Sequence, residues 1–154
     1  MKFLKDNKGL SDSILRAIEQ FWGVGLPENY RNFLIEHNGG EPENKIFKFQ
    51  TQADGSCLDQ FFGVVRDYNN NLLMKYKYLG DRVMDTMLPI ARDVYGNLIL
   101  LTVKGKDRNK VYFWDHEMEA DTENGEKADY SNLTLIADSF TEFVEGLRAE
   151  DQDD

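Results

Sequence analysis

The chain has 154 residues, of which 41% are hydrophobic and 30% are charged. A chain of this length can bury a substantial core, so we expect one globular domain over residues 1–154. Its one cysteine, Cys57, excludes an internal disulfide and a four-cysteine zinc site. The sequence has no apolar run long enough for a membrane span or a secretory signal, which predicts a cytoplasmic protein without membrane contact.

The net charge of −10 is unevenly distributed. Residues 1–114 contain 14 acidic and 16 basic residues, whereas residues 115–154 contain 14 acidic and two basic residues. A surface of this kind repels nucleic acid and attracts a basic partner. The alternative is that the acidic residues serve solubility alone.

The N-terminal part predicts two short helices. The first follows Ser11, a suitable N-cap, and ends at Gly23. Five residues at helical spacing form its apolar stripe: Ile14, Leu15, Ile18, Phe21 and Trp22. The second helix begins at Leu26-Pro27 and stops at Asn38-Gly39-Gly40. Its expected core residues are Tyr30, Phe33 and Leu34.

The rest of the chain predicts a sheet and two more helices. The expected extended segments are 46–49, 58–65, 88–91, 97–103, 110–114 and 133–137. A helix is predicted over residues 67–78, and a last one over 140–147 after a capping box at Ser139 and Glu142. Residues 115–132, the acidic insert, have no periodicity and predict a surface excursion. Residues 148–154 predict an acidic, solvated tail.

Five short motifs in series resemble those of the SUKH superfamily, which is named partly after a yeast cell-wall assembly regulator. The first is Leu26-Pro27-x-x-Tyr30-x-x-Phe33-Leu34-x-x-x-Asn38-Gly39-Gly40. The later ones are Phe61-Phe62-Gly63, Leu88-Pro89-Ile90-Ala91 with Asp93 and Gly96, Val111-Tyr112-Phe113-Trp114-Asp115, and Ile136-Ala137-Asp138-Ser139-Phe140-x-x-Phe143.

The resemblance implies an α+β fold with a mixed, mostly antiparallel sheet flanked by helices, two of them N-terminal and one C-terminal. It also implies a non-enzymatic bacterial immunity protein that binds and blocks a polymorphic toxin, often a nuclease or deaminase. The alternative is a regulatory or scaffold module of the yeast type, which binds client proteins without inhibiting them. The acidic insert and the tail follow no family pattern. They are therefore either the source of specificity for a partner or plain solvated segments.

Few residues in the chain suggest catalysis or a cofactor. His37 fits a helix C-terminus, and His116 fits a strand end better than a general base or a metal ligand. Asp59 near Cys57 would raise the thiol pKa, which predicts an inert cysteine. The acidic residues of the insert do not stand at the positions that ligate the ion in a calcium-binding EF-hand loop. We therefore expect neither an enzyme, a metal nor a cofactor.

The sequence does suggest residues for binding a protein partner. Lys104, Lys106, Arg108 and Lys110 form a basic loop that is either a plain hairpin tip or docks on the acidic insert. The candidate contact residues for a basic toxin domain encoded nearby are Tyr95, Trp114, Asp115, Glu117, Glu119, Asp121 and Glu123. For Trp114, an exposed position and a core position are equally compatible with the sequence.

Overall fold

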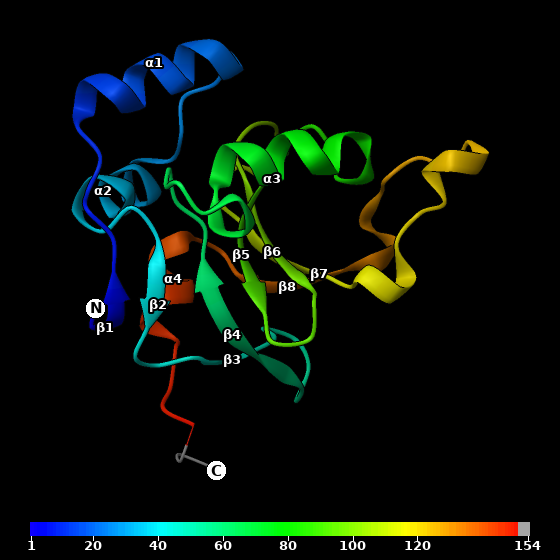
Figure 1. The fold of residues 1–154 in the computed structure, drawn as a ribbon. Coiled ribbons are helices and arrows are strands. Elements are labelled where there is room, and N and C mark those ends of the chain that lie inside the picture. The colour runs from blue at the N-terminus through cyan, green and yellow to red at the C-terminus, as the bar shows by residue number, and fades with distance from the viewer. Residues whose placement is uncertain (151–154) are drawn as a thin grey trace.

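The computed structural model describes residues 1–150, which fold into helices and strands (Figure 1). The α-helices are α1 (Asp12–Trp22), α2 (Glu28–Glu36), α3 (Leu72–Leu79) and α4 (Phe140–Glu145). The strands are β1 (Phe3–Asp6), β2 (Gly40–Pro42), β3 (Ile46–Lys48), β4 (Gly55–Phe61), β5 (Met87–Asp93), β6 (Leu98–Thr102), β7 (Val111–Trp114) and β8 (Leu133–Ala137). Short 3-10 turns are η1 (Tyr68–Asn70), η2 (Gly80–Arg82), η3 (His116–Met118), η4 (Thr122–Asn124) and η5 (Tyr130–Asn132). Of the expected tail, residues 151–154 lie outside this range.

The strands form one sheet in the order β1-β2-β4-β5-β6-β7-β8, with β3 paired to β4. Among residues 1–150, every pair of named strands is antiparallel, and one parallel bridge joins Gly63 and Asn71. The predicted α+β fold with a mostly antiparallel sheet flanked by helices is therefore confirmed.

Helices α2 and α4 cover one face of the sheet with aromatic side chains. The ring of Phe33 on α2 lies 4.9 Å from Phe61 on β4 and 5.0 Å from Phe140 on α4. Phe143 on α4 lies 5.6 Å from Phe47 on β3. This aromatic cluster holds both helices on the sheet, because buried rings contribute large apolar areas.

Helix α3 and the acidic insert cover the opposite face. Pro89, Leu100 and Tyr112 are cross-strand neighbours on this face. The groove beside α3 reaches Pro89, and the Tyr112 ring lies 5.7 Å from that of Tyr130 in the insert. The central strands are covered on both sides, so all five residues of β6 are buried.

Asn38 does more than end the second helix. It is buried, and its Nδ2 donates to the carbonyl oxygens of Lys8 and Val64, each at 3.1 Å. Its Oδ1 accepts a hydrogen bond from the Val64 N–H at 2.7 Å. The next residue, Gly39, has φ +83° and approaches Phe62 so closely that a Cβ would lie 2.6 Å from a carbonyl oxygen. A side chain is therefore excluded at this position.

The first helix begins and ends where the sequence predicts, but the predicted apolar stripe is not buried along its whole length. Ser11 accepts from the Ile14 N–H, and Gly23 closes the helix in the left-handed conformation. Leu15 is buried, but Ile14 and Phe21 are exposed, the latter to 87%. The reason is that α1 lies apart from the sheet and packs mainly beside α2 (Figure 1).

Two predicted boundaries were also wrong. The strand expected over 58–65 is β4, which begins at Gly55 and ends at Phe61. The helix expected over 67–78 is divided into η1 and α3, because the Asn71 side chain caps a new helix by accepting from the Met74 N–H at 3.0 Å.

Candidate protein-binding surface

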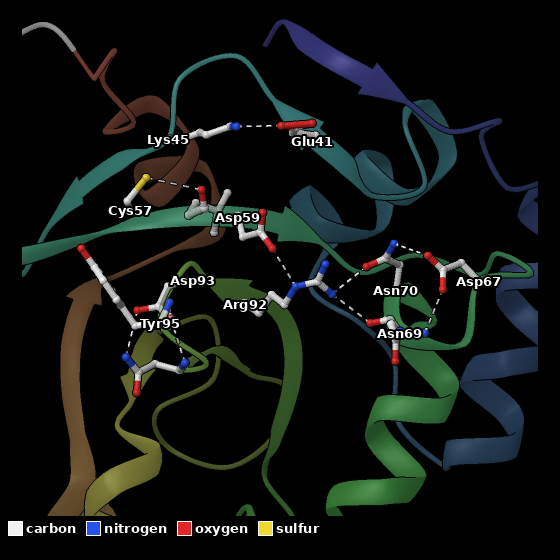
Figure 2. Close-up of polar contacts among 12 residues, drawn as sticks. Glu41, Lys45, Cys57, Asp59, Asp67, Asn69, Asn70, Arg92, Asp93 and Tyr95 are labelled. Carbon is white, nitrogen blue, oxygen red and sulfur yellow. Dashed lines mark hydrogen bonds and ion pairs between the residues drawn. The ribbon is translucent and has the colours of Figure 1, made fainter.

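Tyr95 lies on the turn between β5 and β6, and its side chain is 71% exposed. Asp93 fixes this turn, because its buried carboxylate accepts from the backbone N–H groups of Tyr95 and Asn97 at 2.9 and 2.8 Å (Figure 2). The other carboxylate oxygen accepts from the Ser56 hydroxyl at 2.8 Å. Tyr95 is therefore presented to solvent by a rigid turn.

Trp114 is a core residue, which corrects the interpretation of an exposed aromatic anchor. It is only 3% exposed and pairs with Leu98 on β6. The Arg82 guanidinium lies 6.0 Å from its ring. Because the ring is buried and Arg82 of η2 lies over it, the side chain cannot reach a partner.

The first residues of the acidic insert contact its own last residue and the turn between β5 and β6. The backbone of Asp115 contacts Asn132, the last residue of the insert. The Asp115 N–H donates to the Asn132 carbonyl oxygen at 3.0 Å, and Asn132 Nδ2 donates to the Asp115 carbonyl oxygen at 3.1 Å. His116 Nδ1 lies 2.7 Å from Oδ1 of Asn97, which also accepts from the His116 backbone N–H. These bonds close the base of the insert and join it to the turn that carries Tyr95.

Glu119 is held by Arg82, a residue that sequence reasoning missed. The guanidinium donates from Nε and Nη2 to the two carboxylate oxygens at 3.0 and 2.9 Å. The Arg82 guanidinium also lies 5.6 Å from the Tyr78 ring, in addition to its contact with the Trp114 ring. Because planar bidentate pairs are specific in geometry, this contact fixes the insert on the body. Glu119 is thus partly used within the protein.

The end of the insert is tied to the basic loop through an acidic residue of that loop. The Tyr130 hydroxyl donates to Asp107 at 2.8 Å, and the Tyr112 hydroxyl lies 3.4 Å from the same oxygen. The bond from Tyr130 lowers the pKa of Asp107 and raises that of Tyr130. Burial, followed by the charge of Asp107, raises the pKa of Tyr112 to about 12.

The basic side chains of this loop do not dock on the insert's carboxylates. Lys104 lies 3.9 Å from Asp85, and Lys110 lies 3.8 Å from Asp107 in its own loop. Arg108 donates to the carbonyl oxygens of Val103 and Gly25. The loop therefore meets the insert through Asp107 and Tyr130.

The remaining acidic candidates differ in whether their carboxylates already accept hydrogen bonds within the protein. Asp115 and Asp121 cap short turns, accepting from the N–H groups of Glu117 and Asn124. The side chains of Glu117 and Glu123 are exposed and have no ion-pair partner within residues 1–150. Figure 1 shows the insert (yellow to orange) projecting from the sheet. The arrangement is a fixed loop with unpaired carboxylates facing outward.

A second polar network, also missed from the sequence, lies around Arg92 (Figure 2). Arg92 donates to Asp59 at 2.8 Å, to the Asn70 side chain at 2.6 Å and to the Asn69 carbonyl at 2.9 Å. It thereby joins β4, β5 and the turn before α3. Burial and the nearby Arg92 lower the pKa of Lys75. The arginine is occupied by these contacts, which indicates a structural role.

The residues that could have suggested catalysis have structural surroundings. His37 ends α2, lies 4.4 Å from the Phe3 ring and has Nδ1 3.2 Å from Asp6. Burial and the charge of Glu150 raise the pKa of Cys57, which disfavours its thiolate. Within residues 1–150, no three His, Cys, Asp or Glu side chains are placed to hold a metal ion. None of the helices in that range is long and apolar enough to cross a bilayer.

Comparisons with known proteins place these features in context. The model of the SMI1 / KNR4 family (SUKH-1) matches residues 9–146. A protein of Bacillus subtilis (strain 168), described as the SPbeta prophage-derived uncharacterized protein YokK, is 28% identical over 162 residues. That alignment covers 91% of this chain and 78% of the relative.

Proposed function

Because the chain belongs to the SMI1 / KNR4 family (SUKH-1), we propose that it is a non-enzymatic immunity protein of the bacterial cytoplasm. It binds a toxin and covers the active site or substrate groove of that toxin. The prophage origin of a relative supports a bacterial setting rather than a yeast one.

The observation that carries this proposal is the fixed acidic insert. Residues 115–132 contain seven acidic residues and one lysine. The bonds from Arg82 to Glu119 and from Tyr130 to Asp107 hold the loop in place, so little conformational entropy is lost when its free carboxylates meet a partner. A toxin that acts on nucleic acid carries a basic groove, and carboxylates can occupy the places of phosphates there.

The first experiment tests the partner itself. The chain is co-expressed with the protein encoded by the adjacent gene, and the complex is purified and assayed for the toxin's activity. We expect a stable complex in which that activity is suppressed. A complex in which the activity is unchanged would support the yeast-type regulatory role instead.

The second experiment tests the insert, using Glu117→Gln with Glu123→Gln. These side chains are exposed, so stability should hardly change. Association with the toxin should slow by about three- to tenfold at low salt and less at high salt, because screening weakens steering. Stopped-flow rates across a salt series give the measurement.

A matched control removes the same charge elsewhere, with Glu28→Gln and Asp54→Asn, both exposed. This variant should associate at a rate close to that of the wild-type protein. If the insert variant also binds at the wild-type rate at low ionic strength, the insert is not the contact surface. Tyr95 would then be the next residue to test.

A further inference from the structure

A groove lies between the insert and the segment that follows α3. It has a volume of about 770 Å³, and its walls are residues 80–86 on one side and 122–130 on the other. This volume lies within the range of about 300–1,000 Å³ that is usual for binding sites. The groove is open to solvent and continues into a smaller one of about 230 Å³ that reaches Met87 and Pro89. An open groove of this shape suits an extended chain segment better than a small molecule.

The lining combines apolar and acidic side chains. Val83, Met84, Ala128 and Tyr130 supply apolar surface. The acidic residues of the lining are Asp81, Asp85 and Glu126, whereas the single basic residue is Lys127.

The carboxylates of this groove are largely free. The Asp85 side chain is 89% exposed, and its nearest cation within the described range is Lys104 at 3.9 Å. Asp81 is exposed and has no ion-pair partner within residues 1–150. Glu126 accepts from the Asp121 N–H at 2.9 Å, which positions this carboxylate beside the groove.

From this geometry we infer that the groove binds an extended basic segment of the partner protein. The hydrocarbon stem of a lysine or arginine lies on Val83 and Met84, and its charged head lies at Asp81 and Asp85. Such side chains bury their stems on apolar surface while their heads stay with charges or water. The inference rests on the proposed function only in assigning this segment to the toxin.

A peptide titration tests the groove without the toxin. The isotope-labelled full chain is titrated by NMR with the pentapeptide acetyl-Leu-Arg-Leu-Lys-Ala-amide, and in parallel with the peptide that has glutamine at both basic positions. The basic peptide should shift the amide signals of residues 80–86 and 122–130 together, and the glutamine peptide should not. Shifts elsewhere on the surface, or equal binding of both peptides, would overturn the inference.

Two variants separate local contact from net charge. Asp81→Asn with Asp85→Asn should weaken peptide binding by about tenfold, because two exposed charge pairs are lost. The control with Glu28→Gln and Asp54→Asn should bind like the wild type. Equal weakening in both variants would show that overall charge, and not the groove, attracts the peptide.

A third variant changes the shape of the groove and leaves its charge intact. Ala128→Trp fills the space above Val83 and Met84, so it should abolish the peptide-induced shifts. The rest of the spectrum should remain that of a folded protein. Wild-type binding by this variant would place the peptide elsewhere.

The same variants distinguish this inference from the proposed function. A toxin that binds the wild type but loses affinity for the Asp81 and Asp85 variant supports both. A toxin that binds this variant as tightly as the wild type refutes the groove and leaves the immunity role intact. If the adjacent gene product does not bind but the peptide occupies the groove, the immunity role fails and the groove stands.

Discussion

Phe33 shows how a single residue of the first family motif supports the fold. Its side chain is 6% exposed and contacts aromatic rings on both sides. We expect Phe33→Ala to lower the free energy of unfolding by about 3–5 kcal/mol, because burial is lost and a cavity remains. Phe21→Ala is the matched control on the neighbouring helix, and its 87% exposed ring should contribute little. Denaturant unfolding measures both, and an unchanged midpoint for Phe33→Ala would contradict the packing described.

Arg82 stabilises a whole segment of the chain and not a single position, because its contacts attach the insert to the rest of the protein. Arg82→Met keeps an apolar stem beside Tyr78 and Trp114 but removes both hydrogen bonds to Glu119. We expect a loss of about 1–2 kcal/mol, at the low end for bonds to charged groups because the pair is partly exposed. Faster amide exchange in residues 116–120 should accompany it. A double-mutant cycle with Glu119→Gln isolates the pair, and a coupling of zero would show that other contacts hold the insert.

Elements with local signals could be predicted from the sequence, and those defined by distant contacts could not. Ser11 and Gly23 fix the ends of α1, and Ser139 caps α4 by accepting from the Glu142 N–H. The side of α1 that is buried depends on where α2 and the sheet lie, so the exposure of Phe21 has no local cause. The partner of Arg82 lies 37 residues away in the chain.

The same distinction applies to the candidate surface. The acidic insert was recognisable as a surface excursion from its composition, and Tyr95 was named only as a candidate contact residue. The burial of Trp114 was not, since a strand end can face either the core or solvent. The groove could not be predicted because its two walls, residues 80–86 and 122–130, are far apart in the sequence.

At the scale of the whole molecule, alkaline pH should weaken the structure through tyrosines whose phenol pKa is raised. Burial raises the pKa of Tyr30, burial and then the charge of Asp107 raise that of Tyr112 to about 12, and the hydrogen bond to Asp107 raises that of Tyr130. The folded protein thus keeps protons that the unfolded chain releases near pH 10, and so loses stability as the pH rises from about 10 through 12. Thermal unfolding at a series of alkaline pH values measures this loss.

Tyr112→Phe provides the control for this titration. It removes one of the phenol groups whose pKa is raised, so the stability of this variant should fall less steeply over the same pH interval. An equally steep decline in this variant would mean that other groups, and not Tyr112, are responsible.

The contacts of the insert have an evolutionary consequence. The loop is attached at its base, through Arg82 and through Tyr130, while the stretch between these attachments faces solvent. Mutations in that stretch therefore meet little folding penalty, whereas mutations at the attachments do. A lineage can therefore vary the exposed residues of the insert and still inherit the same scaffold.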